Sequence, residues 1–265
     1  MWNRNLMARN LPTTNIVVIR NLGSMILLVV FFSIKDRRVF KIKREHLKYF
    51  FGTGVISMLF YSTCCFYCQE LCSLSIASIL LYTAPSFVVL LSALLWKEPI
   101  TPQKLTALLL TLVGCACVCG LFSHDVTVTF RGFLAGLASG FFYSLYSIFS
   151  RYALAHYDSM TVTVWTFIFA GAASLILLQP AAMSVALSSP SVWFWIIGLV
   201  VISTVLPYVF YTRGLTQVDS GRASIIASFE PVVATLSGAI LFGEPIGILT
   251  VIGILCVLTG VYILR

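Results

Sequence analysis

One acidic side chain lies deep inside an apolar stretch near the end of the sequence. Glu230 is the tenth residue of the segment 221–242, and Pro231 follows it directly. A carboxylate at such a depth in a membrane is costly, and residues of this kind usually line transport pathways or relay protons. The proline removes a backbone donor and leaves a carbonyl one turn earlier without its usual partner. The pair therefore predicts a site for a proton or a cationic group. The alternative is a neutral Glu230 that hydrogen-bonds a neighbouring helix.

Other polar and helix-breaking residues in apolar stretches could share this substrate- or proton-binding site. Arg20 lies about five residues into the first apolar segment, where it could pair with Glu230, hold a substrate carboxylate or extend to the membrane surface. Four tyrosines could face a cavity or serve only in packing: Tyr82, Tyr143, Tyr146 and Tyr208. The prolines expected to break or bend helices are Pro85, Pro207 and Pro231.

No residue pattern indicates an enzyme, a metal site or a cofactor. The three histidines lie in or beside loops, and the sequence contains no His-Glu-x-x-His, phosphate-binding glycine loop or nucleophile elbow. The eight cysteines lie mostly in apolar stretches and are expected to pack as small hydrophobic residues. An intramembrane enzyme remains an alternative, but it would need a second catalytic group at the depth of Glu230.

The composition determines the elements that must position these residues. Hydrophobic residues make up 59% of the 265 residues and charged residues only 10%, against about 25% in soluble domains. Apolar runs long enough to cross a bilayer recur along the chain, which predicts an all-α, polytopic membrane protein. Nine spans are expected, near residues 15–34, 49–69, 75–96, 103–122, 132–152, 161–178, 192–212, 221–242 and 246–264.

The net charge of +8 comes from basic residues in short loops, a pattern that sets topology and does not indicate nucleic-acid binding. The most basic loop follows the first span, with Lys35, Arg37, Arg38, Lys41, Lys43, Arg44 and Lys48. This loop is expected to be cytoplasmic. The resulting topology predicts a multi-pass protein of the plasma (inner) membrane with a cytoplasmic C-terminus.

A stretch of the sequence occurs twice. Residues 75–100 align without a gap with residues 221–246, and the identical pairs include the mid-segment prolines and the terminal Glu-Pro pairs. The copies lie in the third and the eighth span, an odd offset of five, so they run in opposite directions across the membrane. This predicts two inverted-topology repeats, 1–122 and 132–265, on a five-plus-five plan. Nine helices are expected because the first repeat has no counterpart of span 132–152.

With these features the chain resembles the EamA-type transporters of the drug/metabolite transporter superfamily. The motif residues of the first copy are Ala77, Ser78, Pro85, Lys97, Glu98 and Pro99. Those of the second copy are Ala223, Ser224, Glu230, Pro231, Gly243, Glu244 and Pro245. The family motif residues Glu98, Pro99, Glu244 and Pro245 are expected to end their helices.

The resemblance implies export of small organic metabolites such as amino acids, related metabolites or drugs, coupled to protons by alternating access. The expected partners are a small-molecule substrate, protons, the lipid bilayer and, as one alternative, a second copy in a homodimer. An inactive or scaffolding membrane protein from an N-terminally truncated gene is the other reading, because the missing helix should line the central cavity. On that hypothesis the natural gene encodes one more apolar span upstream.

Overall fold

The computed structural model describes residues 11–120, 128–180, 183, 190–242 and 247–264. Every regular element within these ranges is a helix, which confirms the predicted all-α fold. The chain forms two compact units, and each draws on both halves of the sequence. The first unit comprises residues 1–62 and 149–217, and the second comprises residues 63–148 and 218–265. The chain passes between them three times: within helix α4 (Phe60–Leu71), within helix α8 (Phe130–Leu154), and between Gln217 and Val218.

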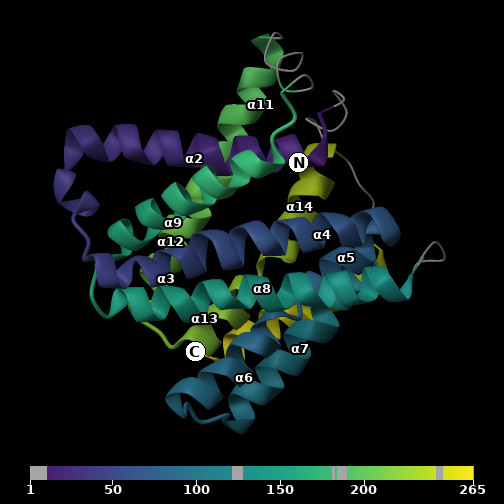
Figure 1. The fold of residues 1–265 in the computed structure, drawn as a ribbon. Coiled ribbons are helices and arrows are strands. Elements are labelled where there is room, and N and C mark those ends of the chain that lie inside the picture. The colour runs from purple at the N-terminus through teal and green to yellow at the C-terminus, as the bar shows by residue number, and fades with distance from the viewer. Residues whose placement is uncertain (1–10, 121–127, 181–182, 184–189, 243–246, 265) are drawn as a thin grey trace. The chain divides into compact units, whose positions relative to one another are not determined.

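The first unit is organised around α2 (Thr13–Lys35) and α9 (Ser159–Ser174), which lie side by side (Figure 1). The two helices are antiparallel. Near the start of α2, Asn15 exchanges two hydrogen bonds with the backbone of Gln179, and further along α2, Met25 contacts Gly171. The unit also contains η1 (Arg37–Phe40), η2 (Arg44–His46), α3 (Leu47–Phe51), η3 (Gly52–Leu59), η4 (Leu175–Leu177), α11 (Pro190–Val200), η5 (Val201–Val205) and α12 (Leu206–Gly214).

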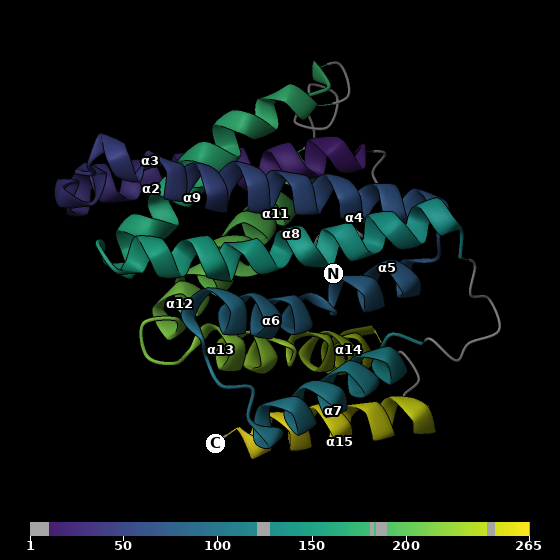
Figure 2. The ribbon, with the colours of Figure 1, turned by 60° about the horizontal axis from the view of Figure 1, so that its bottom comes forward.

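The second unit consists mainly of two three-helix segments. The first segment contains α5 (Leu74–Leu81), α6 (Ala84–Trp96) and α7 (Pro102–Val118). The second contains α13 (Ser220–Ala227), α14 (Glu230–Phe242) and α15 (Ile248–Ile263). Helix α13 packs along α6, and α7 packs along α15 over most of its length (Figure 2).

Small residues allow α7 and α15 to approach closely. A Cβ on Gly114 would lie 2.7 Å from the carbonyl oxygen of Gly253, and a Cβ on Gly260 would lie 2.9 Å from that of Ala107. Residue numbers rise along one helix as they fall along the other, so the helices are antiparallel. Close backbone approach through small residues is a usual way for membrane helices to associate, because lipid offers no hydrophobic driving force between them.

The duplication seen in the sequence extends to the helix boundaries. Helices α13, α14 and α15 begin 146 residues after α5, α6 and α7, and α9 begins 146 residues after α2. Both pairs that pack over the longest stretch, α2 with α9 and α7 with α15, therefore join repeat-equivalent helices in opposite directions. This is the arrangement expected of an inverted-topology repeat.

Six helices in the described part of the chain are long and apolar enough to cross a membrane: Thr13–Lys35, Arg44–Leu71, Ser75–Trp96, Phe130–Leu154, Ser159–Leu177 and Val192–Gly214. Helices α7 and α15 are apolar but shorter. Each predicted span coincides with one described helix or with two or three helices that follow one another. Large hydrophobic side chains such as Ile34, Ile240 and Ile248 are exposed by more than four fifths, as lipid-facing residues are. The chain is an integral, multi-pass α-helical membrane protein.

Candidate functional site

Two broken helices face the candidate site, and both lie in the second unit. Helix α5 ends at Leu81 and α6 begins at Ala84, while α13 ends at Ala227 and α14 begins at Glu230. In each break a backbone N–H bonds to the carbonyl three residues earlier, as in a 3₁₀-helix. These bonds run from Thr83 N–H to the Leu80 carbonyl (3.2 Å) and from Phe229 N–H to the Ile226 carbonyl (3.1 Å).

The cause of both breaks is a proline at the start of the second half-helix. Pro85 and Pro231 lack a backbone N–H and are tolerated in the first turn of a helix but not in its interior. Both prolines are buried. Each break places the C-terminal carbonyl groups of one short helix next to the N-terminal N–H groups of another. These helix ends can interact with charged ligands through the helix dipoles.

A cavity of about 230 Å³ lies beside these breaks. Its lining comes from α5, from the C-terminal end of α7 and from the first turns of α14: Ser75, Ser78, Tyr82, Val118, Cys119, Pro231, Ala234 and Thr235. Most of these side chains carry a hydroxyl or thiol, and none is charged. The cavity is therefore polar enough to hold a small ligand. Any charge that complements a charged ligand must come from a residue outside this lining.

Glu230 supplies such a charge. It is the first residue of α14 and is exposed, and it lies within direct electrostatic range of Tyr82, Cys115 and Cys119. Tyr143 of α8 lies within the same range of Tyr82. The structure thus brings together three residues singled out from sequence, Glu230, Tyr82 and Tyr143. A carboxylate in the first turn of a helix is also stabilised by the helix dipole.

Helix α8 is held against the α5–α6 break by its glycines. A Cβ on Gly140 would lie 2.7 Å from Thr83 Oγ1 and 2.8 Å from the Leu80 carbonyl oxygen, and Gly136 packs directly on Leu80. Thr83 donates its hydroxyl proton to the same Leu80 carbonyl over 2.6 Å. Close helix packing through Gly136 and Gly140 therefore sets the position of Tyr143, less than one turn further along α8.

The remaining predicted residues lie elsewhere. Tyr146 of α8 is buried, with only 2% of its surface exposed. Arg20 and Tyr208 belong to the first unit. The Arg20 guanidinium donates to Ser62 Oγ (2.9 Å) and lies 5.5 Å from the centre of the Tyr61 ring. Tyr208 packs edge-on against Phe167. Pro207 is exposed in the first turns of α12. Three predicted motif residues, Gly243, Glu244 and Pro245, lie outside the described residues, as does the segment 1–10.

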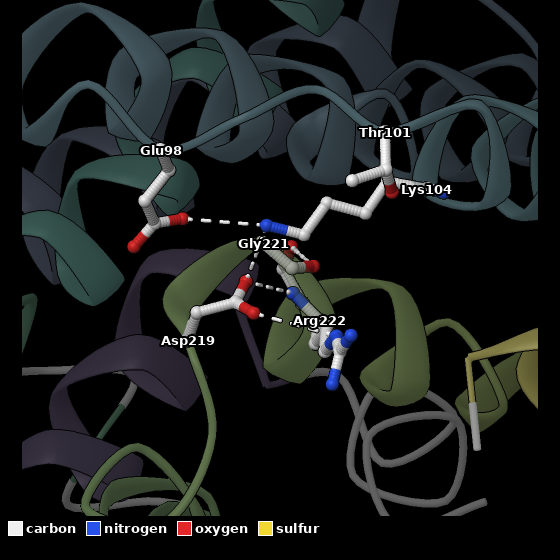
Figure 3. Close-up of polar contacts among 7 residues, drawn as sticks. Glu98, Thr101, Lys104, Asp219, Gly221 and Arg222 are labelled. Carbon is white, nitrogen blue, oxygen red and sulfur yellow. Dashed lines mark hydrogen bonds and ion pairs between the residues drawn. The ribbon is translucent and has the colours of Figure 1, made fainter.

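A group of charged residues that sequence reasoning did not assemble lies at one end of the second unit (Figure 3). The Lys104 ammonium lies 3.0 Å from Asp219 Oδ1 and 3.6 Å from Glu98 Oε2, and its side chain is only 8% exposed. Arg222 Nε lies 3.5 Å from the other oxygen of Asp219. In the sequence, Glu98 belongs to a helix-ending motif, whereas no motif singles out Lys104, Asp219 or Arg222. The detectable signal was that all of these charges lie at the ends of the repeated helices.

The group is anchored by two helix N-termini. Thr101 caps α7 by accepting the Lys104 N–H, and Asp219 caps α13 by accepting the Arg222 N–H over 2.9 Å. Burial alone would raise the pKa of the Asp219 carboxyl, but the Arg222 N–H and the Lys104 ammonium outweigh it and hold this pKa below its ordinary value. Asp219 is therefore ionised, and the group links α7, α13 and the loop after α6 through charge.

Comparison with known proteins identifies what kind of chain carries these features. The sequence profile of the EamA-like transporter family matches residues 3–120 and again residues 130–265. An uncharacterized transporter of Archaeoglobus fulgidus is 33% identical over 189 residues, which cover 71% of this chain and 66% of that relative, slightly under two thirds of its length. The uncharacterized transporter YoaV of Bacillus subtilis is 26% identical over 91% of this chain and 82% of its own length.

Two further proteins are similar to this chain, one with a more specific name and one with a solved structure. A protein of Salmonella typhimurium named a probable amino-acid metabolite efflux pump is 23% identical over 71% of this chain and 66% of its own length. A solved crystal structure aligns with 99% of this chain and 91% of its own, with a TM-score of 0.80 and 18% identity. At this identity the structure supports the fold alone.

Proposed function

This chain is a membrane transporter that belongs to the EamA-like transporter family, and we propose that it exports small organic metabolites that carry an amino group. The single observation that carries the proposal is the cavity beside the two helix breaks, whose lining includes Pro231, the residue directly after Glu230. The name of the Salmonella relative supports amino acids and their derivatives as the substrate class.

The chemistry of the cavity favours a small amine. The Glu230 carboxylate and the C-terminal carbonyl ends of α5 and α13 present negative charge at the breaks, which attracts an ammonium group. Hydroxyls of Ser78, Tyr82 and Thr235 offer hydrogen bonds to the remaining polar groups of a substrate. A cavity of about 230 Å³ suits a molecule of amino-acid size.

We also propose that Glu230 couples transport to protons. Its carboxylate attracts an amine when ionised and loses that attraction when protonated, so substrate and proton compete for one site. Competition of this kind exchanges one species for the other when the site is exposed alternately to the two sides of the membrane. The competition requires only that one group binds both, and Glu230 directly precedes the lining residue Pro231.

The decisive experiment uses purified protein in liposomes with an imposed pH gradient and a panel of radiolabelled amino acids. Glu230→Gln keeps the shape of the protonated acid but cannot release a proton. We expect gradient-driven accumulation to fall to the level seen without a gradient, while counterflow exchange, which needs no net proton movement, falls less. Glu70→Gln removes another exposed carboxylate, on α4, and serves as the matched control. Unchanged dependence on the gradient in the Glu230→Gln protein would exclude the coupling role.

The orientation of the protein is part of the proposal. The basic loop that contains Arg37 and Arg38 is placed in the cytoplasm by the positive-inside trend, which also places the C-terminus there. A single cysteine at Arg38 in a cysteine-free background should react with membrane-impermeant reagent only after the cells are opened. Labelling of intact cells would reverse the assignment.

A further inference from the structure

A second cavity, in the first unit, has no part in the proposed transport site. It has a volume of about 360 Å³ and is lined by Lys41, Ile42, Lys43, His46, His156 and Tyr157. Two segments distant in sequence build it. One is the stretch after η1, and the other is the turn between α8 and α9.

The Tyr157 hydroxyl fixes the two segments to one another. It accepts the backbone N–H of Lys43 over 2.8 Å and lies 2.9 Å from Nδ1 of His46. The imidazole rings of His46 and His156 stack, with their centres 4.3 Å apart and their planes 17° apart. Beneath them the Tyr157 ring packs against the fully buried Phe50. The cavity is therefore set by hydrogen bonds and ring packing from both segments.

The polar groups that line this cavity are mainly donors. Lys41 and Lys43 contribute exposed ammonium groups, and the imidazoles of His46 and His156 contribute ring nitrogens. The carboxylates nearest in sequence do not line it. Asp158 is engaged as the cap of α9, where it accepts the Thr161 N–H over 2.7 Å, and Glu45 is exposed. Positive charge and N–H groups without a lining carboxylate suit a compact anion with several acceptor oxygens.

We propose that this cavity binds a phosphate group, with Lys41 and Lys43 as the cations and His46 and His156 as further donors. The chemistry is shared by the headgroup of an anionic phospholipid and by a soluble phosphate. The basic loop lies at the end of the span formed by α2, where lysines attract anionic lipid headgroups. The inference is independent of the substrate and coupling assigned to the Glu230 cavity.

The test measures binding to the purified full-length chain by thermal shift at constant ionic strength. One arm adds inorganic phosphate in place of chloride, and the other adds a short-chain phosphatidylglycerol in place of the corresponding phosphatidylcholine. Saturable stabilisation by at least one phosphate probe is expected, because a ligand that binds only the folded protein raises its stability. Stabilisation by inorganic phosphate identifies a site for soluble phosphate, and stabilisation by the lipid alone identifies a headgroup site. Absence of both overturns the proposal.

A matched pair of double variants separates a site from diffuse attraction. Lys41→Gln with Lys43→Gln removes two charges that line the cavity. Lys35→Gln with Lys48→Gln removes two charges from the same loop that do not line it, both of which lie over aromatic rings. We expect the first pair to weaken phosphate binding about tenfold or more and the second to change it about twofold or less. Equal losses in the two variants would overturn the site.

Discussion

The two copies of the duplicated segment in the second unit share a backbone and differ in charge. Both copies are broken at the same repeat position, where Pro85 and Pro231 start the second half-helix. Yet Glu230 has Ala84 as its repeat equivalent, and Lys104 has Thr250. The prolines that shape the chain are present in both copies, whereas Glu230, Asp219 and Lys104 each have an uncharged repeat equivalent.

The helix caps illustrate the same difference. Ser73 caps α5 by accepting the Ile76 N–H, and Asp219, its repeat equivalent, caps α13 by accepting the Arg222 N–H. Both satisfy the same orphan backbone donor, but only the aspartate adds a charge that meets Lys104. Exact inverted repeats would give equal energies to states related by their symmetry. Charges confined to one copy remove that equality, so one end state can be favoured.

Removing the buried cation Lys104, which has no charged repeat equivalent, should have the largest effect on the free energy of unfolding. Lys104→Met leaves Glu98 and Asp219 near one another without the ammonium that lies between them. Loss of one partner from a buried ion pair costs about 3–5 kcal/mol of unfolding free energy, because the remaining charge is left uncompensated. Chemical unfolding of the purified protein in detergent, followed by tryptophan fluorescence, measures the loss.

The repeat equivalent provides the control. Thr250→Met makes the same residue at the corresponding position of α15 and should change the unfolding free energy by less than about 1 kcal/mol. Adding Glu98→Gln and Asp219→Asn to Lys104→Met should restore part of the lost stability, since no uncompensated carboxylate then remains. Equal losses for Lys104→Met and Thr250→Met would show that the charged group contributes nothing beyond its packing.

The antiparallel contact between α7 and α15 should instead respond alike in both copies. Gly114 and Gly260 are repeat equivalents, and a Cβ on either would meet a backbone oxygen of the other helix at less than 3.0 Å. Backbone atoms cannot yield as a side chain can, so Gly114→Ala and Gly260→Ala should each cost about 1–3 kcal/mol of unfolding free energy. Thermal unfolding in detergent provides the measurement.

Gly214→Ala is the matched control for this contact, because a Cβ there meets nothing within 4 Å. It should leave stability unchanged or raise it by about 0.4–1 kcal/mol, through the smaller entropy of the unfolded chain. A large loss in one copy with none in the other would show that the two helices do not use their equivalent glycines equivalently.

The sequence predicted those parts of the molecule that depend on local pattern. Apolar runs located the spans, and the repeated prolines located both helix breaks, because a proline acts on its own helix. The grouping of Glu230 with Tyr82 also follows from the repeat, since both lie at a break. The limits 1–122 and 132–265 for the two repeats, and the roles of the individual site residues, stay predictions.

The contacts that sequence could not supply depend on how distant helix ends meet. Lys104 and Asp219 are far apart along the chain, and no periodicity relates a residue in the first turn of α7 to the cap of α13. The stacking of His46 on His156 is a similar case, because the sequence indicates only that each histidine lies in or beside a loop. Tertiary packing, which local pattern does not encode, brings both pairs together.

The smallest expected effect isolates the charge of one helix cap from its hydrogen bond. Asn caps a helix as well as Asp, so Asp219→Asn retains the bond from the Arg222 N–H and removes only the negative charge beside Lys104. Glu98 still neutralises Lys104, so the loss at pH 7 should be on the order of 1 kcal/mol of unfolding free energy.

Because the pKa of Asp219 is held below its ordinary value of 3.8, its charge stabilises the fold fully above about pH 5. That contribution disappears as pH falls through the lowered pKa and the native carboxyl binds a proton. Unfolding curves of the two proteins should therefore differ by a constant amount between pH 7 and pH 5 and converge below about pH 4. A gap that stays constant or widens as pH falls would show that the charge of Asp219 does not stabilise this end of the repeat.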